Sequence, residues 1–515
     1  MTSRNEKASP EDKERPFSIM ETTIAEVHAA FRKGSLTSRQ LVQLYLDRIA
    51  AYDQQGPKLN AIITLNPQAL DQAAKLDAAF GRSGPVGPLH GIPLLIKDQA
   101  DTEGMPTTLG SVLFRDYRPP RDAFVVDKLK KAGAVILAKA TLAEFAAGDT
   151  YGSLFGETRN PYDLLRTAGG SSGGPGAGLS ANFATIAVGQ EGYASIRRPS
   201  TWNSLVGMRP TAGLVSRGGV YAGWPSKNGS LGPMTRTVTD LASLLDVMVG
   251  YDPEDPLTAL GVGRIPGSYA EYLDKYGIQG ARLGILRESI GNLSDEDSPD
   301  FQNIDAVFDK AVSELEAAGA VLVDPIVIPD IRELLGRRAS GPGEATASMA
   351  VYLSRNPGSP YKTLNDVTSA PDYDKVFPPR KAILTGSDAS PSRHYECLLA
   401  REKLMHNLMK VMADNRLDAI VHKSVEHPPT LISEGIKPPY PSMKGAININ
   451  TFLVFVPAIT VPAGFTPDNL PAGITFLGRP YADGLMIKLA FAYEQATRHR
   501  RPPATTPVLP GTRPV

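Results

Sequence analysis

The sequence contains a single cysteine, Cys397, in 515 residues. One thiol cannot form an intrachain disulfide, and it cannot supply a thiolate zinc cluster, which needs several cysteine ligands. A secreted disulfide scaffold is therefore excluded, and the composition suits a reducing compartment. Because Cys397 lies in a helix-like run, we expect it to be a small packed side chain rather than a nucleophile.

An excess of charge is also lacking, since 54 basic side chains balance 54 acidic ones. This balance argues against a nucleic-acid partner or an acidic membrane held by bulk charge, although local patches remain open. The most apolar run, about residues 452–465, is too short to span a bilayer and contains two prolines. Residues 1–16 are charged and have no apolar centre, so we expect disorder there rather than a signal peptide. The sequence predicts a soluble, cytoplasmic protein.

Hydrophobic residues make up 42% of the chain, enough for a large core. Thr37 and Gln40 form a capping box at the start of one predicted helix. Further helices are predicted over 67–80, 121–131, 237–249, 304–315 and 483–498. Strands are predicted over 94–96, 134–138, 183–188, 281–286, 417–421, 458–461 and 474–477. This alternation predicts an α/β fold with a sheet covered by helices on both faces.

One long segment, residues 340–395, breaks this pattern. It contains several Pro, Gly and Ser residues, and we expect it to be irregular. A segment of this kind is either a substrate-facing loop or a surface insertion, and the sequence favours neither. The end of the chain, residues 504–515, is predicted to be a Pro-rich tail.

Two serines and one lysine stand in settings that favour chemistry. Ser171 lies in the stretch Gly169-Gly170-Ser171-Ser172-Gly173-Gly174, Ser195 follows 24 residues later, and Lys97 lies 74 residues upstream at a predicted strand end. A serine hydroxyl needs a base, and a lysine can be one only when neutral, as burial favours. The alternative for Lys97 is an ordinary salt bridge with Asp98. The glycine-rich stretch has alternatives of its own, a phosphate-binding loop or a tight turn, but it lacks the ending of a P-loop.

The usual base for a serine is histidine, and the chain has seven. No Gly-x-Ser-x-Gly elbow is present, and His90 is expected to be structural. His422 and His427 have a spacing that suits a metal, but no clear third ligand accompanies them, so we expect surface or loop roles. The sequence therefore predicts no metal and no organic cofactor.

Taken together, the motifs resemble the amidase signature family of serine hydrolases over roughly residues 20–503. The matching stretches are 36–39, 91–93, 97–98, 158–161, 169–174, 195–197, 207–211, 232–238, 457–464 and 478–480. The resemblance implies the fold of that family, a large mixed β-sheet core covered by helices, as a single catalytic domain over residues 17–503. It also implies that Ser195 is the nucleophile, Ser171 a bridging serine with a cis peptide bond, and Lys97 the terminal base.

The resemblance implies an oxyanion hole built from backbone N–H groups just before the nucleophile, at Gly192, Tyr193 and Ala194. Here the chain departs from the family, which commonly has Asp-Thr-Gly-Gly-Ser where this chain has Glu-Gly-Tyr-Ala-Ser. Backbone donors survive any substitution except proline, although larger side chains restrict the loop. Tyr193 is equally compatible with projection into the acyl pocket and with packing.

The resemblance further suggests substrate-pocket residues, together with the 340–395 segment. They are Gly148, Asp149, Thr150, Gly170 and Ser172, and Ser172 is expected to support the site by hydrogen bonding.

The resulting prediction is an amidohydrolase that cleaves small or aryl amides through an acyl-enzyme. Carbamates (urethanes) and esters share the reacting acyl carbon and stay open as substrates, and the protein is expected to be a monomer or a homodimer. One alternative is the glutaminase-type component of a tRNA-dependent amidotransferase. Another is a catalytically silent binding protein on the same fold.

Overall fold

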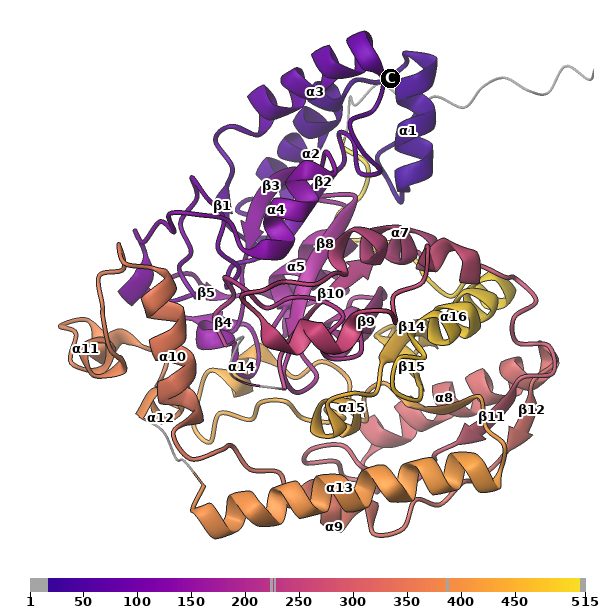
Figure 1. Ribbon diagram of the computed structural model, residues 1–515. Helices are drawn as coiled ribbons and strands as arrows, with labels where there is room; N and C mark the ends of the chain where they lie inside the picture. The colour runs from indigo at the N-terminus through magenta and orange to yellow at the C-terminus, as the bar shows by residue number, and fades with distance from the viewer. Residues whose placement is uncertain (1–16, 223–225, 227, 386–388, 510–515) are drawn as a thin grey trace, which may run out of the picture.

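A large mixed β-sheet of 11 strands forms the centre of the molecule (Figure 1). The computed structural model describes residues 17–222, 226, 228–385 and 389–509, so the predicted disorder of residues 1–16 and the last part of the tail lie outside it. In sheet order the strands are β1 (Ile62–Leu65), β3 (Val135–Ala140), β2 (Pro93–Lys97), β8 (Ile186–Glu191), β10 (Ser230–Thr235), β9 (Val206–Arg209), β14 (Ala458–Phe465), β15 (Pro471–Leu477), β13 (Ala419–Lys423), β11 (Arg282–Ile285) and β12 (Val321–Val323).

Helices surround this sheet, as predicted. They are α1 (Ile24–Lys33), α2 (Ser38–Tyr52), α3 (Ala69–Ser83), α4 (Phe124–Lys131), α5 (Gly173–Ser180), α6 (Arg197–Trp202), α7 (Val238–Met248), α8 (Pro299–Ala317), α9 (Ile331–Gly336), α10 (Glu344–Arg355), α11 (Leu364–Thr368), α12 (Pro378–Thr385), α13 (Pro391–Asp414), α14 (Ile432–Gly435), α15 (Ile449–Leu453) and α16 (Asp483–Thr497). Two small hairpins lie outside the main sheet, β4 (Tyr151–Gly152) with β5 (Gly156–Glu157), and β6 (Arg159–Asn160) with β7 (Asp163–Thr167).

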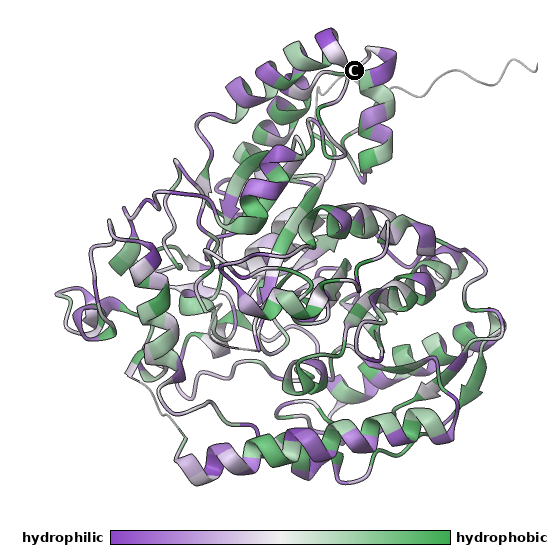
Figure 2. Ribbon diagram, viewed as in Figure 1, coloured by the Kyte–Doolittle hydropathy of each residue, from purple (hydrophilic) through white to green (hydrophobic). Residues whose placement is uncertain are grey.

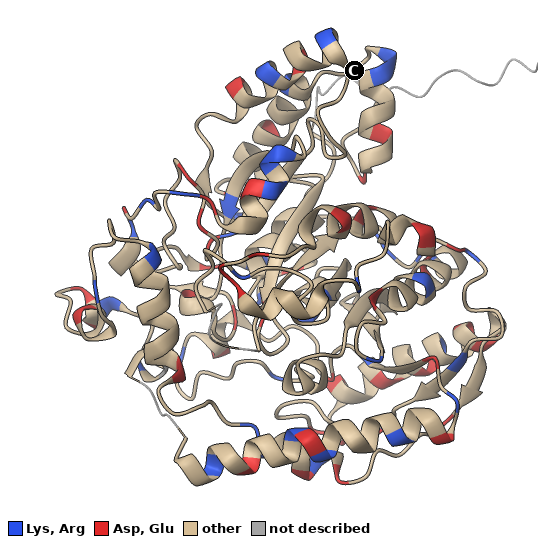
Figure 3. Cartoon of the chain, in the orientation of Figure 1, with Lys and Arg blue, Asp and Glu red and all other residues tan. Residues whose placement is uncertain are grey.

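The sheet changes character along its width. Strands β3, β2 and β8 run parallel to one another, as do β13, β11 and β12, whereas the central strands from β8 to β13 pair antiparallel. Figure 2 shows the central strands largely hydrophobic, which suits strands covered on both faces. Figure 3 shows basic and acidic residues interspersed along the outer helices, in keeping with the balanced charge. Among the described helices, none is long and apolar enough to cross a bilayer.

Local signals account for several helix ends. The Thr37 side chain accepts from the backbone N–H of Gln40, and the Gln40 side chain accepts from Thr37 N–H, which confirms the predicted capping box of α2. Helix α8 begins behind the cap residue Ser298 with a proline at its first position, and its predicted apolar face is buried. The helix ends shortly before Gly319, whose φ of +96° favours glycine.

The prediction missed two central strands, β9 and β10. Both are fully buried, yet they contain Gly207, Gly232 and Pro233, residue types that argue against a strand when read from sequence. Pro233 lies opposite Val188 in the antiparallel pair of β10 with β8. A glycine at 232 is required by packing, because a Cβ atom there would lie 2.1 Å from Met208 O. Close packing therefore overrides propensity at the centre of the sheet.

The glycine-rich stretch leads into a buried helix, α5: residues 169–172 precede the helix, and Gly173 and Gly174 are its first two residues. Every residue from Gly173 to Ser180 is buried, and α5 packs against β2 and β8. A Cβ atom at Gly174 would lie 2.4 Å from the backbone of Thr141, and one at Gly178 would lie 2.8 Å from Leu95. The glycines thus let the helix backbone approach the sheet closely.

The expectation that residues 340–395 are irregular is wrong. The segment contains α10, α11, α12 and the first residues of α13. Its buried side chains, including Tyr352 and Leu353 of α10, join Phe114, Phe145 and Tyr221 in a separate apolar cluster. The Pro and Gly residues that suggested irregular structure lie mainly between these short helices, and burial against this cluster supplies what local propensity lacks.

Candidate active site

The side chain of Lys97 lies at the end of β2 and is fully buried. Its Nζ lies 2.6 Å from Ser171 Oγ and 3.1 Å from the carbonyl oxygen of Gln190. The alternative salt bridge with Asp98 does not form, because Asp98 pairs with the equally buried Lys139 at 2.8 Å. Within the described part of the chain, Lys97 therefore has no carboxylate at ion-pair distance.

This environment favours a neutral lysine. Burial lowers the pKa of Lys97 well below its ordinary range, against the opposing attraction of Glu191. A neutral amine beside a serine hydroxyl can accept its proton. The contact of Lys97 with Ser171 therefore has the geometry that such a proton transfer requires.

The loop that carries Ser171 is held from behind. The peptide bond between Gly170 and Ser171 is cis, as the resemblance implied. Arg198 donates to the carbonyl oxygen of Gly170 at 2.9 Å and pairs with Asp149 at 2.6 Å. Its guanidinium also lies 4.9 Å from the centre of the Trp202 ring. Arg198 therefore ties the serine loop to the 148–150 segment.

Ser195 lies beside this loop and is the most accessible of the three residues. It keeps 6% of its surface exposed, whereas Lys97 and Ser171 have none. The backbone N–H of Ser172 donates to Ser195 O at 3.2 Å, which joins the two serine segments. In the described part of the chain no hydrogen bond links Ser171 Oγ to Ser195 Oγ. The structure thus brings Lys97 to Ser171 and places Ser195 at the solvent-facing end.

Ser172 occupies a supporting position, as expected from the sequence. Its hydroxyl accepts from Gln190 N–H and donates to Gln190 O, both at 3.2 Å. These bonds connect the start of α5 to the end of β8, the strand that leads into the Ser195 loop. The hydroxyl of Ser171, by contrast, faces Lys97.

Glu191 organises the loop before Ser195 from inside. One carboxylate oxygen accepts from the backbone N–H groups of Ile196 and Arg197, both at 2.9 Å, and the other pairs with the Arg197 side chain. Burial alone would raise the pKa of Glu191, but the charge of Arg197 and these bonds hold it below its ordinary value. The Glu191 carboxylate therefore fixes the turn into α6.

The N–H groups of residues 193–195 are left without a partner inside the described chain. No hydrogen bond of the described residues uses the backbone N–H of Tyr193, Ala194 or Ser195 as donor, and Gly192 and Tyr193 are partly exposed. Free N–H groups beside a serine are what an oxyanion hole needs. The Tyr193 ring does not lie free in a pocket, since the guanidinium of Arg338 lies 4.9 Å from its centre.

The five residues suggested for a substrate pocket are all buried. Asp149 pairs with Arg198, Thr150 Oγ1 donates to Gly169 O at 2.7 Å, and the 148–150 segment backs the serine loop. A Cβ atom at Gly148 would lie 2.6 Å from Ser442 Oγ, so this position is closed. These contacts are structural, and a contact of the five residues with substrate stays a prediction.

The segment 340–395 nevertheless reaches the same area. Arg380 of α12 donates to Asp149 O at 3.0 Å, and Arg338, just before the segment, donates to Gly192 O at 2.6 Å. Asp101, four residues after Lys97, accepts from Tyr352 Oη and Asn356 Nδ2 of the same segment. The segment therefore lies against the surroundings of Lys97 and Ser171, while Arg338, which precedes it, reaches the loop before Ser195.

The three histidines that the sequence singled out are buried, and the expected surface or loop role is wrong for His422, which lies within strand β13. His422 and His427 each bond a neighbouring backbone carbonyl through Nδ1, and His427 Nε2 lies 3.0 Å from Asp300. His90 packs against Phe31 and Phe80. The described residues contain no cluster of three or more His, Cys, Asp or Glu side chains suited to a metal. Cys397 is buried, as expected for a packed side chain.

Sequence reasoning missed the residues that hold the site together. Arg338, Thr451 and Asn450 reach the Glu191–Ser195 segment from positions more than 140 residues away. Asp149 and Arg198 lie in or beside segments that the sequence singles out, but nothing in the sequence indicates that they pair. The sequence contains one indication, Tyr193 and Ala194 in place of the two glycines common in the family, which suggests that this loop has different contacts.

Comparison with known proteins identifies relatives along nearly the whole chain. The family model described as Amidase matches residues 40–487. A probable amidase of Arabidopsis thaliana is 34% identical over 95% of this chain and 92% of its own length. A glutamyl-tRNA(Gln) amidotransferase subunit of Thermoanaerobacter pseudethanolicus is 32% identical over 93% of this chain and 97% of its own. The crystal structure of the peptide amidase of Stenotrophomonas maltophilia superimposes with a TM-score of 0.82 at 32% identity, covering 95% of this chain and all of that one.

Proposed function

The chain belongs to the amidase family, and we propose that it hydrolyses small or aryl amides through a Ser195–Ser171–Lys97 relay and an acyl-enzyme. Membership makes it an amidohydrolase, while the substrate and the residue roles are the proposal. The observation that carries the proposal is the buried contact of Lys97 Nζ with Ser171 Oγ, made without a carboxylate partner for the lysine among the described residues.

In the proposed first step, Ser195 Oγ attacks the acyl carbon of the substrate. Its proton passes to Ser171 Oγ while the proton of Ser171 passes to neutral Lys97. The relay then returns a proton to the leaving amine, and the C–N bond breaks. Water, activated by the same relay, attacks the acyl-enzyme and releases the acid, which restores Ser195.

The negative oxygen that develops in each step needs donors. The N–H groups of the predicted donors Gly192, Tyr193 and Ala194, and that of Ser195, donate to no described residue, which supports placing the oxyanion there. One such donor is worth about 3–4 kcal/mol of barrier. Because only backbone groups are involved, Tyr193 and Ala194 in place of two glycines are compatible with this role.

Carbamates and esters remain within the proposal, because both present the same acyl carbon and develop the same oxyanion. A second candidate is the glutaminase role within a tRNA-dependent amidotransferase, which the relative of Thermoanaerobacter pseudethanolicus favours. Glutamine hydrolysis that appears only with partner subunits would select it. A catalytically silent binding protein is the least supported alternative, because Lys97 and Ser171 remain in contact.

The test is a matched panel of an aryl amide, an aryl carbamate, an aryl ester and glutamine. Ser195→Ala is expected to lower kcat/KM by about 10³-fold or more and to abolish labelling by a fluorophosphonate probe. Ser171→Ala and Ser172→Ala form a matched pair of buried neighbours, and the first is expected to cost far more activity because only Ser171 contacts Lys97. Wild-type activity in Ser195→Ala, or an equal loss in the matched pair, would overturn the assignment.

A further inference from the structure

The loop that supplies the proposed oxyanion hole is held by its carbonyl groups. Arg338 donates to Gly192 O at 2.6 Å, and the hydroxyl of Thr451 donates to Tyr193 O at 2.9 Å. Arg338 also donates to Thr451 Oγ1 at 3.0 Å, so the two side chains support each other. Neither residue belongs to the relay, and both come from segments far away in the sequence.

Holding a carbonyl also orients an N–H group. In a trans peptide, the C=O and the following N–H point in opposite directions across one rigid plane. The peptide bonds that follow Gly192 and Tyr193 are trans, since the cis bonds of the described chain lie elsewhere. Bonds to Gly192 O and Tyr193 O therefore turn the N–H groups of Tyr193 and Ala194 to the other side of the loop, where no described residue bonds them.

The charge of Arg338 is directed at this loop. Among the described residues, no Asp or Glu lies within ion-pair distance of its guanidinium, which bonds only to Gly192 O and Thr451 Oγ1. Burial lowers the pKa of Arg338 to about 10, so the side chain stays charged at neutral pH. A charged donor makes a stronger bond to a carbonyl than a neutral one.

Tyr193, which stands where the family commonly has glycine, makes a further contact with Arg338. The Arg338 guanidinium lies 4.9 Å from the centre of the Tyr193 ring, a cation–π distance. A glycine at 193 would offer no such face and would leave the loop more conformational freedom. The tyrosine that replaces glycine and the arginine that stacks on it thus form one unit.

We infer that Arg338, with Thr451 and the Tyr193 ring, is a positioning residue that orients the N–H groups of the oxyanion loop. The inference rests on the proposed function, because the N–H groups matter for catalysis only if Ser195 is the nucleophile. Arg338 acts through the loop backbone and not through contact with the reacting atoms.

The test compares Arg338→Met with Arg337→Met. Methionine keeps much of the volume and removes the donors, while Arg337 is exposed and pairs with Glu333 and Glu396 on the surface. Arg338→Met is expected to lower kcat by about 10- to 100-fold with KM changed by less than about threefold, because the loss falls on the transition state. Arg338→Lys is expected to recover part of kcat, and Arg337→Met to match wild type.

A second measurement separates positioning from a general structural role. Affinity for an aldehyde analogue of the acyl group, which forms a tetrahedral adduct, is expected to fall with kcat/KM, whereas affinity for the product acid is expected to hold. If Arg338→Met fails to fold, Thr451→Val provides the same test, since it removes a single hydroxyl at nearly constant volume. Wild-type kcat in both variants, or equal losses in both affinities, would overturn the inference.

Failure of the proposed function gives a different result. If the wild-type protein hydrolyses no member of the panel, the proposed function is refuted. The conformation of the loop is then measured by hydrogen exchange. Faster exchange of the peptide containing Gly192–Ser195 in Arg338→Met than in wild type and Arg337→Met would still support the positioning of the loop. Unchanged exchange would refute it independently of activity.

Discussion

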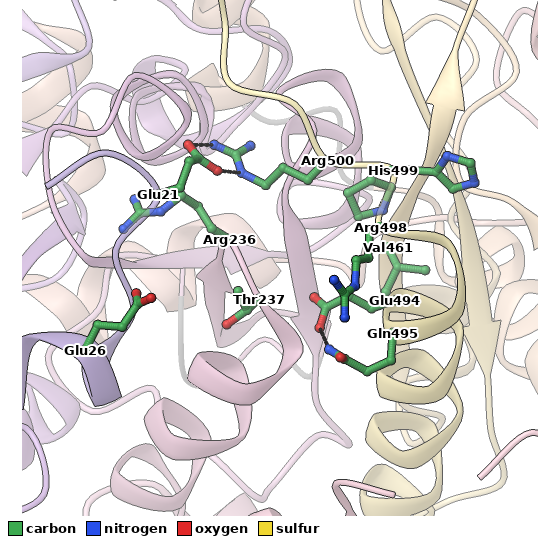
Figure 4. A pocket seen from close by; sticks show the side chains of 11 residues that line it. Glu21, Glu26, Arg236, Thr237, Val461, Glu494, Gln495, Arg498, His499 and Arg500 are labelled. Atoms are coloured by element: carbon green, nitrogen blue, oxygen red, sulfur yellow. Dashed lines mark hydrogen bonds and ion pairs between the residues drawn. The ribbon is translucent and has the colours of Figure 1, made fainter. Parts of the chain in front are cut away.

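Two polar regions lie at opposite ends of β10, and they differ in the partners of their charged side chains. At one end, Ser230 lies opposite Glu191 of β8, beside the candidate active site. At the other end, Arg236 follows the strand and lines a cavity of about 510 Å³ near α1, α7 and α16 (Figure 4). In that cavity Glu21 pairs with Arg500 at 2.6 Å, and His499 lies 2.7 Å from Glu314. Arg236 donates to three backbone carbonyls.

The active-site end leaves Lys97 with neutral partners among the described residues, although it is the more deeply buried region. Nearby, Asp98 forms an ion pair with Lys139, and Glu191 forms one with Arg197. Buried charges that are paired stabilise a geometry, while a buried amine without a counter-charge tends to stay neutral and can accept a proton. For locating reactive groups in this protein, the lack of a counter-charge at Lys97 is therefore more informative than the size of the distant cavity.

The largest effect is expected from Lys97→Met, which tests the difference between the unpaired lysine and the paired charges. Activity is expected to fall by at least about 10³-fold, because the relay loses its base. The melting temperature at pH 7 is expected not to fall, since folding lowers the pKa of Lys97 and the unfolded chain binds the extra proton. This penalty on wild type shrinks as the pH rises towards the unfolded lysine pKa of about 10.4.

Arg500→Met is the control for Lys97→Met from the other region. It removes the partner of Glu21, so it is expected to lower the melting temperature and to leave kcat/KM unchanged. Activity retained by Lys97→Met, or a marked loss of its stability at pH 7, would remove the distinction between the two regions.

A second change tests the paired charges beneath the site. Lys139→Met leaves Asp98 buried without its partner and is expected to cost about 3–5 kcal/mol of unfolding free energy. Urea denaturation measures this loss, and Lys131→Met, which breaks an exposed pair with Asp127, is the control expected to change little. A small effect of Lys139→Met would mean that this ion pair contributes little to the stability of the fold around Asp98.

The smallest expected effect concerns Glu494, which lines the distant cavity (Figure 4). Burial raises its pKa to about 7, above the unfolded value, so the folded chain binds more protons between about pH 4.5 and 7 and stability falls as the pH rises through that window. Glu494→Gln keeps an acceptor for Val238 N–H and is expected to flatten the slope by at most about 1.4 kcal/mol per pH unit.

Glu21, in the same cavity, provides a contrast of opposite sign. Burial favours its neutral form, but the charge and hydrogen bonds of Arg500, together with Arg236 and Asn182, outweigh burial and lower its pKa. Its stabilising contribution is therefore present at neutral pH and lost as the pH falls. Stability curves of Glu494→Gln and Glu21→Gln that shift in the same direction would contradict this account of pairing.

Elements with local signals were predictable. The Thr37 capping box, the apolar face of α8 and the strand that ends at Lys97 all follow from a few neighbouring residues. Strands β9 and β10 were not predictable in this way, because Gly232 and Pro233 look unfavourable until close packing against Met208 and Val188 is known. The helices of residues 340–395 were missed because burial in a shared cluster, rather than propensity, supports them.

The sequence by itself determined the family, the order of the motifs and the candidates Lys97, Ser171 and Ser195, because these depend on residue identity and spacing. Only the tertiary structure decided that Asp98 pairs with Lys139 rather than with Lys97, and that Arg338 and Thr451 hold the carbonyls of the Gly192–Tyr193 segment. Such pairings join residues that are distant along the chain. Which partner a buried charge finds depends on the packing of the whole fold, and that choice decides whether a lysine is a structural cation or a base.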